Sequence, residues 1–315
     1  MLATGPISLP QALLRPLNAA TCDLLRVNGD LGINFFEPKG DAALILHDSI
    51  SWRIFKNPLA LFVGGIAAVL LELAEPRVRT GVWEHSHFRS QPLVRMRRTG
   101  LAALTTVYAA RCVSEKAIAR IVRLHETIEG QMPSGRQYSA NDPELLTWVH
   151  ATATFSFFHA YSRYVHAQSN LHFDSFCREG LPVAALYGAV QAPASEFEME
   201  VLFASARDNL EPSLIVFEFL EIMKTTAILP SVLRPLQRTL VRAAIDILPQ
   251  WVRQRLELHK GWNMRRGEVA IIKHIGKLTD RVLIRSSPAV HACVRLGLPE
   301  DYLYRPVVMD PGVYQ

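Results

Sequence analysis

The stretch VRMRRTGLAALTTVYAARCVSEKAIARIVRLHETIEG, residues 94–130, predicts two consecutive helices and with them the fold class. In its second half, apolar side chains and one histidine recur at the i, i+3, i+4 and i+7 positions of a helical stripe, namely Ile121, Leu124, His125 and Ile128. Arginine and glutamate residues lie largely on the other faces. The pattern therefore predicts a buried stripe that contains an imidazole, and a buried imidazole must hydrogen-bond, titrate or bind a metal.

Helical periodicity also dominates outside this stretch, and alternating strand patterns are scarce. We expect helices near residues 44–55, 58–74, 92–110, 114–129, 143–165, 196–207, 213–225, 231–246, 248–259, 266–285 and 288–296. Ser114 and Asp142 are the expected N-caps of two of them. Residues 133–141 are expected to form a loop, and residues 302–315 an extended tail. The sequence thus predicts an all-α protein with a single multi-helix domain over 1–315, whose motifs lie in a core at about 80–167.

Composition restricts the function classes. The 315 residues are 49% hydrophobic, which suffices for a sizeable core, and the net charge is +5. No basic stripe with interleaved aromatic residues is present, which argues against nucleic-acid binding. The four cysteines are widely spaced and form no CxxC pair, so we expect reduced thiols in a cytoplasmic protein rather than disulfides or structural zinc. They are Cys22, Cys112, Cys177 and Cys293.

The longest apolar run is Pro58–Leu71, with Glu72 and Glu75 just after it. It is shorter than the roughly 20 residues that a membrane span requires, so a buried core helix is the better interpretation. Gly64 and Gly65 in its middle would let a large group approach the backbone. The N-terminal MLATGPISLPQALLRPL lacks the features of a signal peptide. Membrane contact is expected, if at all, through an exposed apolar channel mouth.

No GxGxxG, P-loop, HExxH or GxSxG motif occurs, so candidate chemistry rests on histidines and arginines. His125 fits either a hydrogen-bonded core histidine or an axial ligand of haem iron, because imidazole suits iron and an apolar pocket suits the macrocycle. His150 shares a face of the helix at 143–165 with apolar neighbours. It fits a second haem contact, a partner of the ligand, or a packed structural residue.

A basic cluster opens the helix at 92–110 with Arg95, Arg97 and Arg98, followed by Thr99. Arg95 and Thr99 are four residues apart and therefore share a helix face. Such a pair can hold a carboxylate, for example a haem propionate, or polarise a bound oxygen species. The alternative is a solvated first turn. Because positive charge is disfavoured near a helix N-terminus, we expect an acidic group nearby.

The segment GVWEHSHF, residues 81–88, carries Glu84, His85 and His87 in an expected loop or short turn. These residue types can ligate a metal ion. However, the segment lacks a third ligand at a standard distance, which favours local structure or pocket lining over a metal site.

Three motifs together resemble one family: Arg95-x-x-x-Thr99, RLHETIEG at 123–130 and GRQYSANDPELLTWVHATA at 135–153. The family contains the fungal MpaB-type oxygenases and the bacterial latex clearing protein, a rubber oxygenase. The resemblance implies an all-helical fold that binds haem b. It also implies an enzyme that uses dioxygen to cleave carbon–carbon double bonds of isoprenoid chains.

Carried over to this chain, the resemblance implies that His125 is the proximal haem ligand and metal-binding residue, with His150 as the competing candidate. Arg95 and Thr99 correspond to the paired distal residues. Arg98 stands where the latex enzyme has a lysine. Because arginine stays protonated and ligates iron poorly, a lysine-capped resting state is not expected, and polyisoprene is doubtful as the substrate.

Glu84 is the nearest counterpart of the distal carboxylate expected in the latex enzyme. Arg95 and Arg98 are the candidate partners of the haem propionates.

The leading hypothesis is therefore a haem b-dependent oxygenase that acts on an apolar, alkene-containing or isoprenoid-like small molecule with O2. Oxidative C=C cleavage is its most specific form, and hydroxylation or peroxidation remain open. Two alternatives come from other classes: a haem carrier or sensor without turnover, and a helical lipid-binding protein without a cofactor. The sequence identifies neither the electron donor nor the oligomeric state.

Overall fold

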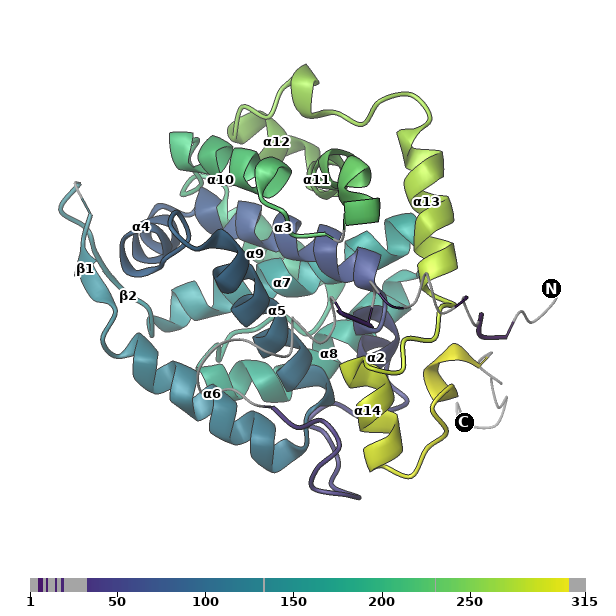
Figure 1. Ribbon diagram of the computed structural model, residues 1–315. Coiled ribbons are helices and arrows are strands. Elements are labelled where there is room, and N and C mark those ends of the chain that lie inside the picture. The colour runs from purple at the N-terminus through teal and green to yellow at the C-terminus, as the bar shows by residue number, and fades with distance from the viewer. Residues whose placement is uncertain are drawn as a thin grey trace.

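The computed structural model describes residues 5–7, 10, 15, 18–19, 33–132, 134–229 and 231–305. Regular structure in these residues is almost entirely helical, which confirms the all-α prediction (Figure 1). The helices are α2 (Ile50–Phe55), α3 (Pro58–Ala74), α4 (Pro76–His85), α5 (Pro92–Tyr108), α6 (Arg111–His125), α7 (Pro143–Tyr164), α8 (Asn170–Tyr187), α9 (Glu196–Ala206), α10 (Leu214–Thr225), α11 (Arg234–Asp246), α12 (Gln250–Arg255), α13 (Glu268–Thr279) and α14 (Pro288–Arg295). Short 3₁₀ turns cover Ser231–Leu233, Lys260–Trp262 and Tyr302–Tyr304.

Helix α3 lies at the centre of the fold (Figure 1). It begins where the Asn57 side chain accepts hydrogen bonds from the backbone N–H groups of Leu59 and Ala60. Its most extensive contact is with α7, and α2, α4, α10, α11 and α13 also pack against it. Most of its side chains are buried in the main hydrophobic cluster, which reaches from Phe35 to Tyr304. This is the buried core helix expected from its apolar run.

One member of the glycine pair of α3 serves helix packing. A Cβ atom on Gly64 would lie 2.6 Å from Cδ1 and 2.9 Å from Cα of Phe157 on α7. A Cβ atom on Gly65 would meet no atom of the described residues within 4 Å. Only Gly64 is therefore required by the close approach of the two helices.

We expect Gly64→Ala to lower the free energy of unfolding by about 2–3 kcal/mol, because α3 and α7 must separate. Gly65→Ala, its matched control, is expected to raise stability by about 0.5–1 kcal/mol, because alanine has the better helix propensity and space is free. Urea denaturation of both variants measures the difference. Equal effects of the two substitutions would contradict this packing.

Several sequence expectations need correction. Ser114 is no N-cap: α6 begins at Arg111, and the Ser114 hydroxyl donates to the carbonyls of Thr105 and Ala109. Helix α6 ends at His125 instead of 129. The helix expected at 44–55 covers only Ile50–Phe55, and those at 248–259 and 266–285 are shorter than expected.

Two helices and a hairpin were not expected. Helix α4 occupies the segment expected as a loop, and α8 was missed. Antiparallel strands β1 (Glu129–Gln131) and β2 (Gln137–Ser139) pair Gly130 with Tyr138. In the tail, Tyr302–Tyr304 form a 3₁₀ turn rather than an extended strand, and residues 306–315 lie outside the described residues.

A sharp corner joins α3 to α4. Glu75 ends α3 and caps α4 by accepting from the backbone N–H of Val78, and Arg77 pairs with both Glu75 and Glu144 at the start of α7. Within the described residues, no single helix is long and apolar enough to cross a membrane. Helices α3 and α4 would suffice only as a pair, and they are bent by 109°.

Candidate active site

Helices α5 and α6 pack against each other, and one end of this pair carries some of the predicted site residues. Arg95 lies in the first turn of α5, and His125 is the last residue of α6. Charge–charge interactions connect Arg95 to both His125 and Glu72, so three helices contribute to one cluster. We call Glu72, Arg95, Thr99 and His125 the site cluster.

The apolar stripe of α6 is less buried than predicted. The buried residues of α6 are Ser114 and Ile118, whereas Ile121, His125 and the following Ile128 are half-buried. Leu124 is 61% exposed. The prediction of a fully buried stripe is therefore wrong. Protein atoms cover the stripe near the middle of α6 and leave apolar surface open around His125.

His125 is a neutral imidazole with an unsatisfied nitrogen. Burial lowers its pKa, and the positive charge of Arg95 lowers it further, while hydrogen bonding with Asn141 acts in the opposite direction. Nδ1 is shielded from solvent and has no well-formed hydrogen bond to any described residue. A neutral ring at neutral pH keeps a lone pair that a metal ion can use.

Arg95 and Thr99 share a helix face, as predicted. Arg95 Nη1 donates to Thr99 Oγ1 at 2.6 Å, and the same hydroxyl donates to the Arg95 carbonyl at 3.0 Å. Burial lowers the pKa of Arg95, Glu72 opposes this, and Arg98 adds to it. Arginine nevertheless stays protonated in proteins, so this end of the helix pair presents a fixed positive charge. Arg98 and Thr99 are exposed.

Glu72 is the site residue that sequence reasoning missed. Burial raises its pKa to about 7, although the charge of Arg95 lowers it. The expectation of an acidic group near the basic cluster is thereby confirmed. The sequence held a signal, because Glu72 is the only charged residue in α3, but it was interpreted only as marking the end of an apolar run.

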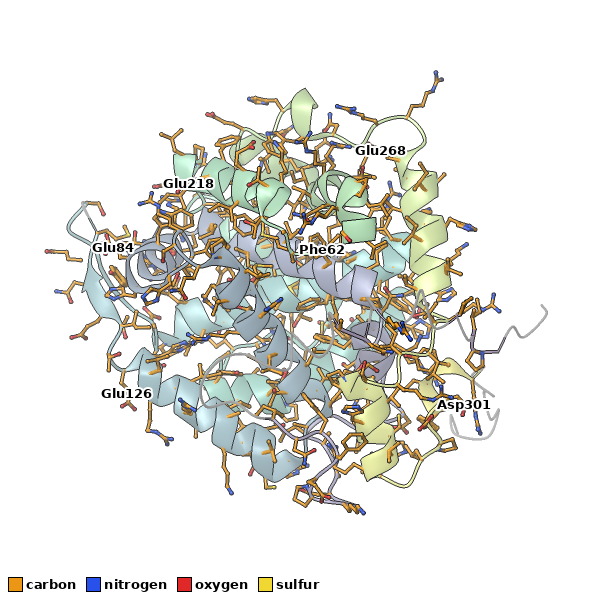
Figure 2. The ribbon with its side chains drawn as sticks, viewed as in Figure 1. Phe62, Glu84, Glu126, Glu218, Glu268 and Asp301 are labelled. Carbon is orange, nitrogen blue, oxygen red and sulfur yellow. The ribbon has the colours of Figure 1, made fainter. Side chains whose placement is uncertain are left out.

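Glu84 and His85 bind the hairpin instead of the site cluster. Tyr138 of β2 donates to Glu84 Oε2 at 3.0 Å, and His85 Nε2 lies 3.0 Å from the same hydroxyl, which leaves the imidazole as the donor in that bond. Figure 2 shows Glu84 on α4 beside the hairpin. Within the described part of the chain, no three histidine, cysteine or acidic side chains gather closely enough to hold a metal ion.

His150 packs between α7 and α8. Its Nε2 lies 3.4 Å from the Thr154 hydroxyl, and a Cβ atom on Gly180 would approach the ring to 3.2 Å. Burial lowers its pKa to about 4. The nearby His159 has a pKa lowered to about 4 for the same reason and contacts the ring of Phe155 at 4.1 Å. Both rings are therefore neutral and closely packed.

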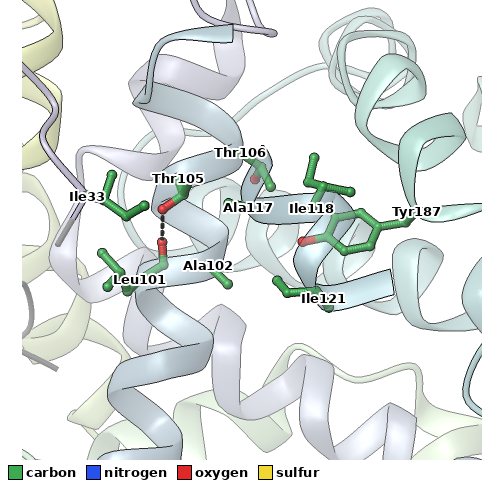
Figure 3. Close-up of a pocket in the computed structure, with 9 residues that line it drawn as sticks. All are labelled: Ile33, Leu101, Ala102, Thr105, Thr106, Ala117, Ile118, Ile121 and Tyr187. Atoms are coloured by element: carbon green, nitrogen blue, oxygen red, sulfur yellow. Dashed lines mark hydrogen bonds between the residues drawn. The ribbon is translucent and has the colours of Figure 1, made fainter. Parts of the chain in front are cut away.

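A small cavity lies between α5 and α6, one turn from His125 along the α6 stripe (Figure 3). Its volume is about 20 Å³, room for one water molecule and far below the roughly 300 Å³ of small-molecule sites. It is lined by Ile33, Leu101, Ala102, Thr105, Thr106, Ala117, Ile118, Ile121 and Tyr187. A shallower surface pocket of about 290 Å³ near His47 and Leu296 contains no residue of the site cluster.

Cys177 and Cys293 are buried and free, and Cys112 is free and half-buried. Cys22 lies outside the described residues.

Comparison with known proteins gives one match. The sequence model of a family described as "ER-bound oxygenase mpaB/B'/Rubber oxygenase, catalytic domain" matches residues 52–277. This range extends beyond the motif core expected at about 80–167 and includes α3, which carries Glu72. No curated protein and no solved structure matches the chain significantly.

Proposed function

Because this chain belongs to the family of mpaB and rubber oxygenase catalytic domains, we propose that it is a haem b-dependent oxygenase of an apolar, alkene-containing small molecule, and that it cleaves a C=C bond oxidatively. The single observation that carries the haem assignment is His125, a half-buried neutral imidazole at the end of α6 that keeps a lone pair for iron. It lies close enough to the charge of Arg95 for that charge to lower its pKa.

The chemistry of the site cluster fits a haem. Haem iron binds a neutral imidazole, and His125 would supply it. The porphyrin requires apolar surface, and the α6 stripe leaves Leu124 exposed and Ile121 half-buried beside that ligand. The propionates require cations, and Arg95 and Arg98, three residues apart on α5, would supply them. When bound, the haem would supply the redox chemistry that activates dioxygen.

The chain's own residues would orient the reacting groups by hydrogen bonds and would hold a proton for them. Arg95 donates hydrogen bonds from a preorganised guanidinium, and Thr99 fixes its direction through the 2.6 Å bond. Two carboxyl groups are candidates for holding a proton. Glu84 is engaged by Tyr138, whereas Glu72 interacts with Arg95 and has a pKa of about 7. Glu72 is therefore the better candidate, because it is poised to release and accept a proton near neutral pH.

The test is the absorption spectrum of protein expressed with a haem supply, beside His125→Ala and His150→Ala. We expect a Soret band in the wild type and in His150→Ala, and its loss in His125→Ala, because only His125 supplies the ligand. Circular dichroism of the three proteins controls for folding.

Each other outcome has a definite meaning. Loss of the band only in His150→Ala would transfer the ligand role to His150. A colourless wild type after haem titration would overturn the haem assignment and favour a lipid-binding protein. A haem-loaded wild type that consumes no oxygen with any isoprenoid alkene would be a carrier or sensor.

A further inference from the structure

The segment between His125 and α7 is firmly attached to the rest of the fold. Strands β1 and β2 pair Glu129 with Ser139 at one end and Gln131 with Gln137 at the other. Next to them, the backbone N–H of Ala140 donates to the Ile128 carbonyl at 2.9 Å. Tyr138 is 5% exposed and joins this hairpin to α4 through Glu84 and His85. The hairpin therefore determines the position of Asn141, which lies two residues after the end of β2.

The Asn141 side chain is oriented by α6. Its Nδ2 donates to the Val122 carbonyl at 3.0 Å. Val122 lies in the last turn of α6, three residues before the helix ends at His125. Because only the amide nitrogen can donate to a carbonyl, this bond assigns the nitrogen and the oxygen of the Asn141 side chain. Oδ1 then points away from Val122, and it is shielded from solvent without a well-formed hydrogen bond to any residue in the described ranges.

Asn141 Oδ1 and His125 Nδ1 are complementary. One is an acceptor with two lone pairs, and the other becomes a donor when it carries the ring proton. The two side chains are neighbours, because the Val122 carbonyl that holds Asn141 lies three residues before His125 and on the same face of α6. Leaving either atom unpaired in a buried position is unfavourable, so a small rotation that pairs them is favourable.

We propose that Asn141 is the positioning residue of His125. Its Oδ1 accepts a hydrogen bond from Nδ1–H of the ring, which selects one tautomer and leaves the lone pair of Nε2 for a metal ion. The role in haem binding rests on the proposed function, but the tautomer does not. Hydrogen-bonded partners of this kind orient a metal-binding imidazole and increase its basicity.

Two substitutions separate this role from simple capping of α6. Asn141→Asp keeps an acceptor near His125 and loses the donor to Val122. Asn141→Leu loses both. If Asn141 only capped α6, the two variants would behave alike. If it positions His125, the aspartate variant keeps the positioning and the leucine variant does not.

The first measurement needs no haem. Long-range ¹H–¹⁵N NMR of the full chain, at a pH where the imidazole is neutral, reports which ring nitrogen of His125 carries the proton. We expect the Nδ1–H tautomer in the wild type and in Asn141→Asp, and a mixture in Asn141→Leu. The Nε2–H tautomer in the wild type, or an unchanged tautomer in Asn141→Leu, would overturn the proposal.

The second measurement uses the haem-loaded ferrous proteins. The iron–histidine stretch in resonance Raman spectra is expected at lower frequency in Asn141→Leu, and at the wild-type frequency or above in Asn141→Asp. Haem affinity is expected to fall about 10- to 100-fold in Asn141→Leu. A Soret band that survives in His125→Ala would refute the proposed ligand and leave the tautomer result standing. An unchanged stretch in Asn141→Leu, with a His125-dependent Soret band, would refute only the role of Asn141.

Discussion

Replacement of Arg295 by methionine is expected to lower the free energy of unfolding by about 3–5 kcal/mol. Arg295 ends α14, is 2% exposed, and donates to three backbone carbonyls. These belong to Asp41, Phe35 and Tyr108, the last residue of α5. Methionine fills a similar volume but leaves three acceptors unsatisfied, at roughly 1–3 kcal/mol for each buried group. Because methionine is uncharged, the free-energy cost of burying the Arg295 guanidinium is absent in the variant, which offsets part of the loss.

Urea denaturation followed by tryptophan fluorescence measures the change, because unfolding exposes side chains such as the buried Trp52. Arg285→Ala is the matched control, because Arg285 pairs with Glu300 at the surface and both side chains are well exposed. We expect the control to change stability by less than about 1 kcal/mol. A loss below about 1 kcal/mol in Arg295→Met as well would show that the three carbonyls find other donors.

Glu72→Gln is expected to stabilise the protein above neutral pH, by about 2–3 kcal/mol near pH 8. The folded pKa of Glu72, about 7, lies above its value in the unfolded chain, near 4.5. The folded state therefore holds the proton more tightly, and wild-type stability falls as the pH rises from about 4.5 to 7. A shift of this size corresponds to about 3 kcal/mol, which we reduce slightly because part of the side chain remains accessible.

Stability curves of the two proteins between about pH 5 and pH 8 test this. Because glutamine cannot ionise, the curves are expected to separate as the pH rises and to approach each other at the acidic end. A constant difference across the range would mean that Glu72 has an ordinary pKa. If Glu72 holds the proton that the reaction requires, the stabilised variant will also lose oxygen consumption, a common trade-off at active sites.

The sequence predicts those features of the fold that depend on local interactions, above all the positions where helices begin. Helices that begin with a capping residue and proline, such as α7 after Asp142, were located to within a residue or two, because those signals act within one turn. The same signal is present at Glu75-Pro76, although no helix is expected there from the sequence. Since Glu75 can cap a new helix, Pro76 instead opens α4.

The site was predictable only in part. The spacing of Arg95 and Thr99 fixed their shared face, and the motifs identified the family. Glu72 and Asn141 could not be assigned from spacing, because Glu72 meets Arg95, and Asn141 meets the end of α6, only through tertiary packing. Exposure of the α6 stripe was equally unpredictable, since periodicity identifies an apolar face without identifying what covers it.

The central position of α3 also affects how the chain is made. Its main partner, α7, begins about 70 residues after α3 ends. At a synthesis rate of about 5–20 residues per second, the apolar surface of α3 emerges from the ribosome several seconds before that partner exists. During this interval the most hydrophobic helix of the nascent chain has only its close neighbours α2 and α4 to pack against. Chains interrupted before Tyr164 would lack part of α7 and would keep that apolar surface of α3 exposed.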